Sequence, residues 1–165
     1  MRTDHDVDSV EKVWRLAQSV RVAMLTLHDG EGLSARPMYS LIPDDWEAVW
    51  FVTDRNSPKI GEAVQRMDAL LTYSTGENGE HLVMSGILTV VEDRDKLRGL
   101  WGGGADLYFP KGPDDPSAVL LRFEPFLAEY WKHGGGGAIN FVLQYAKAKL
   151  TGSRARLGDH GRVAL

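Results

Sequence analysis

The sequence predicts a single mainly β (α+β) domain, a small antiparallel barrel of about six strands flanked by helices. Most of the expected strands follow one another across tight turns, which favours antiparallel pairing. The first of them is not followed by the Gly-x-Gly-x-x-Gly turn of a doubly wound parallel sheet. Closure into a barrel would also remove exposed strand edges. The length of 165 residues suits one domain with its own core.

The chain is expected to open with an amphipathic helix and then to change to strand periodicity. Apolar residues recur at helical spacing between residues 7 and 20, and Asp8 with Glu11 resembles a capping box at the helix start. Three strands separated by tight turns follow, at residues 22–27, 33–42 and 48–53. Pro37 lacks an N–H, so we expect it at a bulge or with its nitrogen facing away from a partner strand.

The rest of the chain is expected to mix helices with strands. Ser57 and Pro58 should start a helix that ends near Met67, because serine caps helices and proline is favoured at their first position. The elements expected after it are two strands, a short helix, a strand and a last helix: residues 69–74, 81–92, 94–101, 119–131 and 139–150. Gly86 should mark a bulge or bend, and the last strand should break at Pro125.

Composition limits the classes of function. The net charge of −4 argues against a non-specific nucleic-acid surface, and the absence of Cys excludes disulfides and thiolate metal sites. The scattered histidines make any metal site improbable. We see no signal peptide and no run of ~20 apolar residues for a membrane span. We therefore expect a cytoplasmic protein with one domain at residues 1–150 and a basic, flexible tail at residues 151–165.

Two cations surround the expected start of the second helix. Arg36 lies on the second strand, and Lys59 lies in the first turn of the helix that Ser57 caps. A lysine is mildly disfavoured there, because the amino end of a helix carries partial positive charge. A bound anion would reconcile its placement, since backbone N–H groups and Lys59 would converge on it. The pair predicts a phosphate site, although either cation alone is more typical of a solvated surface.

Residues 22–74 resemble the pyridoxamine-phosphate-oxidase-like FMN-binding split barrels. Three later segments make the resemblance closer: residues 100–101 (LW), 108–116 (YFPKGPDDP) and 128–131 (AEYW). Together they look like the bacterial general stress protein 26 subgroup, through their order and spacing rather than through any single motif. The resemblance implies an antiparallel six-stranded split β-barrel with flanking helices. It also implies a homodimer with two FMN molecules, or alternatively FAD, in clefts at the subunit interface.

The resemblance also implies roles for individual residues. Arg36 and Lys59 would reach the flavin phosphate with the hydroxyl of Ser57 nearby, and residues 51–53 would run along the ring and the ribityl chain. The expected cofactor-binding set is Arg36, Pro37, Met38, Phe51, Val52, Thr53, Asp54, Ser57, Lys59, Trp101 and Trp131. The two tryptophans could wall the ring from the partner subunit, with ordinary core packing an equally good interpretation.

The function that these residues favour is that of a flavin-binding, stress-related protein. It could be an oxidoreductase acting on a small molecule or simply a flavin carrier, and its catalytic residues stay unknown. Oxidation of vitamin B6 is not expected, because residues 157–165 do not look like the carboxy-terminal segment that such oxidases use to bind a second phosphate. Two alternatives stay open: an F420- or haem-related split barrel, and a cofactor-free dimeric interaction module.

Overall fold

The computed structural model describes residues 4–28, 31–57, 66–76, 79–132 and 159–165. Its longer elements are α1 (Asp4–Val20), β1 (Val22–His28), β2 (Leu33–Tyr39), β3 (Val49–Asp54), β4 (Met67–Ser74), β5 (Glu80–Val91), α3 (Arg94–Gly99), β6 (Ala118–Lys132) and β7 (Asp159–Ala164). The short 3-10 helices η2 (Ala105–Leu107) and η3 (Gly112–Asp114) lie between α3 and β6. Within the described ranges, no helix is long and apolar enough to span a membrane.

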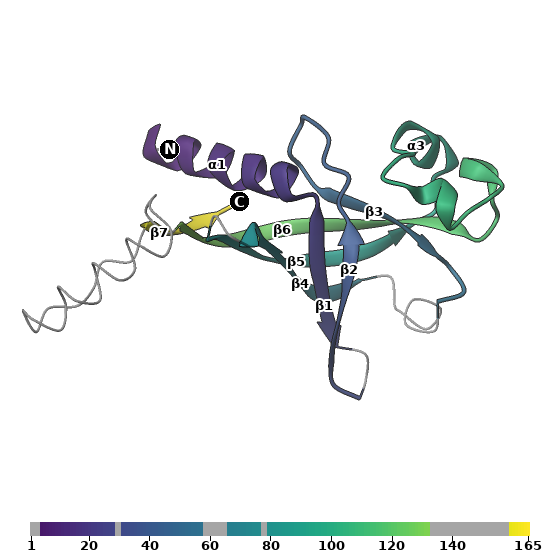
Figure 1. Cartoon of the computed structure of the whole chain (residues 1–165), viewed down its shortest axis with the longest axis horizontal. Coiled ribbons are helices and arrows are strands. Elements are labelled where there is room, and N and C mark those ends of the chain that lie inside the picture. The colour runs from purple at the N-terminus through teal and green to yellow at the C-terminus, as the bar shows by residue number, and fades with distance from the viewer. Residues whose placement is uncertain (1–3, 29–30, 58–65, 77–78, 133–158) are drawn as a thin grey trace, which may run out of the picture.

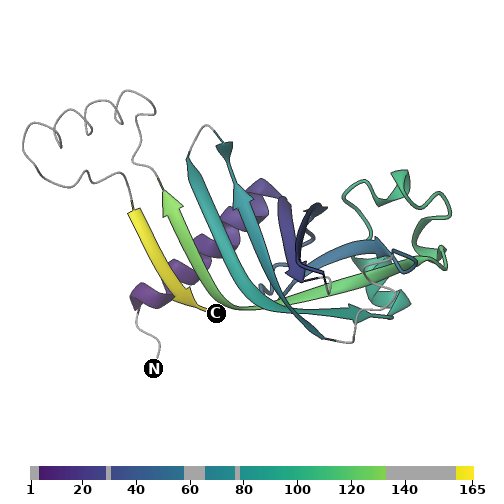
Figure 2. The same ribbon diagram turned by 90° about the horizontal axis from the view of Figure 1, so that it is seen from below.

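The strands form one antiparallel sheet in the order β2-β1-β4-β5-β6-β3, and β7 pairs with β6. The long strands β5 and β6 run from the end that carries α1 and β7 to the end that carries α3 (Figure 1). The curvature of the sheet is clearest in Figure 2. Its edge strands β2 and β3 are connected by an isolated bridge between Leu41, two residues after β2, and Trp50 of β3. The expected antiparallel split barrel with flanking helices is confirmed, whereas closure into a complete barrel is wrong.

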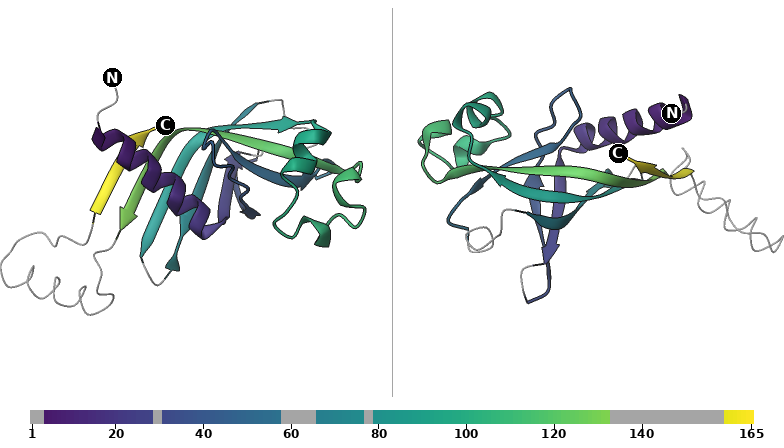
Figure 3. Two further views of the ribbon diagram at one scale, coloured as in Figure 1. Left: turned by 90° about the horizontal axis from the view of Figure 1, so that it is seen from above. Right: turned by 180° about the vertical axis from the view of Figure 1, so that it is seen from behind.

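Helix α1 packs across β4, β5 and β7 on one face of the sheet (Figure 3). Its expected apolar stripe is confirmed, because Val13, Trp14 and Ala17 are buried in the main core. The helix begins at Asp4 rather than at the expected capping box of Asp8, since no proline or glycine among residues 4–8 stops it from extending by another turn.

A polar pair lies inside this core. The hydroxyl groups of Ser40 and Tyr73 are 2.9 Å apart and buried, so each satisfies the other. Burial raises the pKa of the Tyr73 phenol well above its usual value, and the hydrogen bond with Ser40 offsets only part of that rise.

Gly86 lies at the expected bulge. The register between β5 and β6 shifts between Ser85 and Gly86, and Gly86 lies opposite Pro125. A Cβ atom on Gly86 would come within 2.6 Å of the Phe123 ring. Strand β6 is not broken at Pro125, so that expectation is wrong. On its other side β6 pairs with β3 up to Phe123 and with β7 from Leu127 onward, and the missing N–H falls where that partner changes.

The end of the chain differs from the flexible tail that we expected over residues 151–165. Residues 159–164 form β7 on β6, and Val163 is buried. Gly161 lies so close to Tyr130 that a Cβ atom there would be 2.6 Å from the ring hydroxyl. The tail expectation is therefore wrong for this part. Lys59, most of the expected helix at residues 57–67 and the expected helix at residues 139–150 lie outside the described residues, as do residues 151–158.

Candidate functional site

A cavity of about 590 Å³ lies between the ends of β2 and β3 and the glycine-rich loop that follows α3. Five residues of the expected cofactor set line it: Pro37, Met38, Val52, Thr53 and Asp54. The loop, residues 102–109, forms the opposite wall. The volume lies within the range of roughly 300–1,000 Å³ that is usual for small-molecule sites. Pro37 and Val52 are 15 positions apart in the sequence. The fold thus brings the five residues of these two strands to one place.

An isolated β-bridge just beyond the end of β2 explains why these residues meet. Leu41 and Trp50 exchange backbone hydrogen bonds of 2.9 Å, which hold the two sheet edges together beside the cavity. Pro37 is in regular register with Met24 of β1, so it does not lie at a bulge. Because β2 is an edge strand, a proline nitrogen that faces its unpaired side removes no ladder hydrogen bond. The second of the two expected placements of Pro37 is the one the fold uses.

Arg36 lies on the face of β2 opposite to Pro37 and Tyr39, in the half-buried row that also holds Ser34 and Met38. Its Nη1 atom donates a hydrogen bond of 3.4 Å to the hydroxyl oxygen of Ser57. Its Nη2 atom is buried and finds no acceptor in the described part of the chain, and the same holds for the hydroxyl of Ser34. Buried polar groups without partners are costly, and a buried guanidinium nitrogen especially so. An anion placed here would supply the missing acceptors.

A turn after β3 carries Ser57 toward Arg36. The carboxylate of Asp54 accepts a 2.8 Å hydrogen bond from the backbone N–H of Asn56, and the N–H of Ser57 donates to the carbonyl of Asp54 at 3.0 Å. Such an Asx turn reverses the chain without any help from glycine. Lys59 follows two residues later, outside the described residues. The Arg36–Ser57 part of the expected phosphate site is therefore present, and the Lys59 part stays a prediction.

Three other residues of the expected set do not line the cavity. Phe51 is fully buried in the main core and does not line the cavity. Trp101 packs edge-on against Phe109 with ring centroids 6.1 Å apart, and its indole N–H donates to Asp106 at 2.8 Å. Trp101 thus supports the glycine-rich loop from behind. Trp131 lies at the other end of the sheet, where it stacks on His160 with ring centroids 5.0 Å apart.

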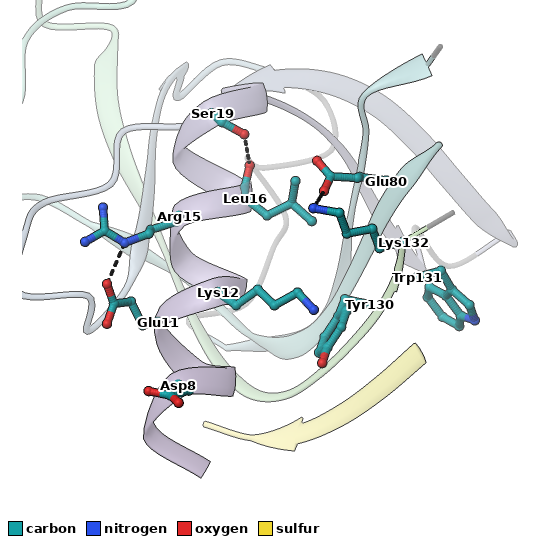
Figure 4. Close-up of a pocket in the computed structure, with 10 residues that line it drawn as sticks. All are labelled: Asp8, Glu11, Lys12, Arg15, Leu16, Ser19, Glu80, Tyr130, Trp131 and Lys132. Atoms are coloured by element: carbon teal, nitrogen blue, oxygen red, sulfur yellow. Dashed lines mark hydrogen bonds and ion pairs between the residues drawn. The ribbon is translucent and has the colours of Figure 1, made fainter. Parts of the chain in front are cut away.

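Trp131 borders a second hollow, a groove of about 480 Å³ between α1 and the ends of β5 and β6 (Figure 4). The cations drawn in Figure 4 already have partners within the chain. Lys132 pairs with Glu80 at 2.8 Å, Arg15 pairs with Glu11 at 2.6 Å, and the ammonium of Lys12 lies 4.0 Å from the centre of the Tyr130 ring. This groove therefore offers a ligand less unmet charge than the Arg36–Ser57 pair does.

Sequence reasoning missed the loop that forms the outer wall of the cavity. Leu107 and Tyr108 line the cavity although their side chains are 84% and 80% exposed. Gly103 and Gly104 have φ values of +64° and +78°, and the ring of Tyr39 occupies the space that a Cβ atom on Gly103 would need. The glycine run just before two large apolar residues was the available signal, because a loop that exposes such residues usually has something to bind.

Comparisons with known proteins were made on the whole chain. A family model described as "Pyridoxamine 5'-phosphate oxidase like" matches residues 8–156. The structure of a putative general stress protein 26 from Jannaschia sp. CCS1 is 30% identical, with a TM-score of 0.73 over 96% of this chain and 99% of that one. A general stress FMN/FAD binding protein from Xanthomonas citri is 27% identical, with a TM-score of 0.71 over 79% and 92% of the two chains.

A putative general stress family protein from Xanthomonas campestris pv. campestris is also similar, at 28% identity and a TM-score of 0.70 over 82% of this chain and 93% of that one. A search of curated proteins gave no match.

Proposed function

This chain belongs to the pyridoxamine 5'-phosphate oxidase-like family, and from that membership we propose that it is a flavin-binding, stress-related protein with FMN as its preferred cofactor. The observation that carries the proposal is the buried Nη2 atom of Arg36, beside the hydroxyl of Ser57, for which the described part of the chain provides no acceptor. A phosphate dianion would supply that acceptor in a charge-assisted hydrogen bond. The name of the Xanthomonas citri relative, an FMN/FAD binding protein, supports the same cofactor class.

Arg36, Ser57 and Lys59 would hold the phosphate, and the cavity walls formed by β2 and β3 would take the flavin ring. Pro37, Met38 and Val52 provide apolar surface there, and Thr53 adds a hydroxyl. Met38 lines the cavity and belongs to the same half-buried row of β2 as Arg36, so one ligand could reach both places. A bound flavin would supply the redox chemistry, and the protein would position it and shield it from water. The flavin phosphate would keep the buried charge of Arg36 paired while the flavin is bound.

We propose further that two copies of the chain pair through the outer face of β1 and β2. Val22, Met24 and Tyr39 are 47%, 40% and 37% exposed on that face, and Val22 is the register partner of Tyr39. A contiguous exposed apolar surface of this kind is typical of an interaction site. Pairing would place the flavin at the subunit interface, where Trp101 and Trp131 would be available to the site of the other copy. We also propose that the protein is cytoplasmic and acts as an oxidoreductase on a small molecule.

The cofactor proposal is tested by titrating the purified protein with FMN, FAD, F420 and haemin in turn, and by following each chromophore spectroscopically. We expect FMN to bind tightest, with FAD weaker because its adenylate must stay outside the cavity. Tighter binding of F420 or haemin would instead favour the rival cofactors of the same superfamily. A protein that binds none of the four would favour the cofactor-free interaction module.

A further inference from the structure

We propose that the outer wall of the cavity is a second ligand subsite, which takes a flat organic molecule that is neutral or cationic and carries no phosphate. The subsite is formed by Leu107 and Tyr108, which we call the apolar lip. The assignment of the other wall to the flavin rests on the proposed function, whereas the lip itself is defined by its own contacts. The observations that carry it are its exposure, its rigid support and the charge of the cavity.

The exposure of the apolar lip is unusual for residues that line a cavity. Leu107 is 84% exposed and Tyr108 is 80% exposed, and the two are adjacent in sequence at one wall of the same hollow. Single exposed apolar residues need no explanation, but a pair that faces a ligand-sized space does. A ring that enters this space would remove apolar surface of both side chains from water, which is the main driving force for binding flat ligands.

The loop behind the apolar lip is held firmly, so the lip cannot simply fold inward. Ala105 and Phe109 anchor it in the smaller hydrophobic cluster with 7% and 6% of their surface exposed. The N–H groups of Leu107 and Tyr108 donate 3.0 Å hydrogen bonds to carbonyls three residues earlier. Trp101 donates a hydrogen bond to Asp106 of the loop, and the Tyr39 ring packs against Gly103. A surface that is already ordered loses little conformational entropy when a ligand binds.

The charge of the cavity limits what the apolar lip can bind. Among the described lining residues, Asp54 is the one with a formal charge, and it is negative. Arg36 does not line the cavity, and its guanidinium is hydrogen-bonded to Ser57, which does not line it either. A phosphate ester at the lip would therefore face a carboxylate with no cation to offset it, whereas an amine or an uncharged ring would not. The flavin phosphate would bind at Arg36, and the ligand at the apolar lip would carry no phosphate.

Three naphthalene probes that differ in charge test this inference on the full-length, FMN-loaded protein. They are 1-naphthylmethylamine, 1-naphthol and 1-naphthyl phosphate, and their binding is followed by equilibrium dialysis. We expect the amine and the naphthol to bind at least tenfold tighter than the phosphate. The substitutions Leu107→Ser and Tyr108→Ser should each weaken binding by roughly five- to tenfold, in line with the loss of one apolar or aromatic contact.

Matched variants separate the lip from general effects. Leu33→Ser removes an apolar side chain of similar exposure, 79%, far from the cavity lining, and should leave probe binding unchanged. Tyr108→Phe keeps the ring and should bind the probes like the wild type. In the wild type, the amine should bind tighter than naphthol because Asp54 is negatively charged. Asp54→Asn should abolish this difference, while naphthol still binds.

The outcomes distinguish this inference from the proposed function. FMN affinity of Leu107→Ser and Tyr108→Ser should stay close to that of the wild type, because β2 and β3 form the flavin wall. If the wild type takes up no flavin, the proposed function fails, and the same probes are then titrated into the flavin-free protein, where loss of binding in Leu107→Ser still supports the lip. The inference is overturned if no probe binds, if the phosphate probe binds tightest, or if Leu107→Ser and Leu33→Ser behave alike. It is also overturned if Leu107→Ser weakens self-association in sedimentation and leaves probe affinity intact, since the lip would then be a contact between copies.

Discussion

Arg36 donates a hydrogen bond from Nη1 to the hydroxyl of Ser57 at 3.4 Å, which connects the edge strand β2 to the turn that follows β3. The two residues are 21 positions apart in the chain. The neighbouring Nη2 atom is buried and has no acceptor among the residues that the structure describes. The pair is therefore a site with an unmet hydrogen bond, and it is the part of the structure from which the cofactor proposal follows.

Replacing both cations of the phosphate site should weaken FMN much more than riboflavin. In Arg36→Ala with Lys59→Ala, the dissociation constant of FMN should rise by at least about a hundredfold, because two charged hydrogen-bond donors are lost at roughly 1.5–3 kcal/mol each. Riboflavin lacks the phosphate and should bind both proteins alike. Quenching of flavin fluorescence measures both constants.

The control for this pair is Arg55→Ala, which removes one positive charge in the same turn. Arg55 pairs with Glu92 at 3.4 Å and does not line the cavity. Its FMN affinity should stay close to that of the wild type. Equal weakening in Arg55→Ala would mean that net charge rather than the Arg36 site governs affinity.

Gly103→Ala should disturb the outer wall of the cavity. The residue has a φ of +64°, and its Cβ atom would overlap the Tyr39 ring, with the Cε1 atom of that ring 2.6 Å away. We expect a loss of about 1–3 kcal/mol in the free energy of unfolding, as for other overpacked sites, measured by urea denaturation. Gly99→Ala meets no atom within 4 Å and should be neutral or slightly stabilising. A stable Gly103→Ala protein would mean that the loop is held less firmly than its contacts indicate.

Gly86→Ala should destabilise the fold without any direct effect on the cavity. Its Cβ atom would meet the backbone carbonyl of Glu124 and lie 2.6 Å from the Phe123 ring, and backbone cannot move aside as a flexible side chain can. A decrease of about 1–3 kcal/mol or more in the free energy of unfolding is expected from calorimetry or urea titration. Gly32→Ala, which meets nothing within 4 Å, is the matched control. Identical melting temperatures for the two variants would contradict the bulge packing.

Tyr73 should make the stability of the protein depend on pH above about 10. Burial raises the pKa of its phenol well above the usual value near 10, so the folded state holds this proton where the unfolded chain has lost it. Its contribution to stability is complete below pH 10 and decreases as the pH rises toward the folded pKa. Tyr73→Phe should therefore lose less stability between pH 9 and 11 than the wild type does.

The comparison variant for Tyr73 is Ser40→Ala. It removes the hydrogen bond that lowers the Tyr73 pKa but keeps the burial that raises it, so the wild-type decrease above pH 10 should persist. Urea denaturation at several pH values measures all three proteins. The same slope in Tyr73→Phe as in the wild type would assign the effect to other groups.

Much of the fold was predictable because its signals are local. Turn residues indicated where β1, β2 and β3 lie along the chain, and Gly86 marked its bulge, since each signal depends on only a few neighbouring residues. The expected hairpin between β2 and β3 is wrong, because β3 pairs with β6. Strand β7 was missed because Val163 is the one buried side chain among residues 160–164, and because the strand's pairing depends on β6, whose partner residues lie 27 to 37 positions earlier. The expected break at Pro125 failed for a similar reason: which strand lies beside β6 at that point cannot be read from the residues around the proline.

The candidate site was predictable in part for the same physical reasons. The spacing of Arg36 and Ser57 on consecutive elements indicated that they would meet, and they do. Phe51, Trp101 and Trp131 were expected beside the flavin, yet the direction of a side chain depends on the twist of the sheet and on the tertiary packing around it. The apolar lip was missed because Leu107 and Tyr108 lie in irregular chain, where no periodicity indicates which way a residue faces.

The assignment of Arg36 and Ser57 to a flavin phosphate is tested by the visible absorption spectrum of the purified protein. The spectrum is recorded after incubation with FMN and passage through gel filtration. We expect flavin bands that stay with the protein peak at close to one flavin per chain, and a peak position that corresponds to a dimer. A protein peak that stays colourless after incubation with either FMN or FAD would contradict the assignment of Arg36 and Ser57 to a flavin phosphate.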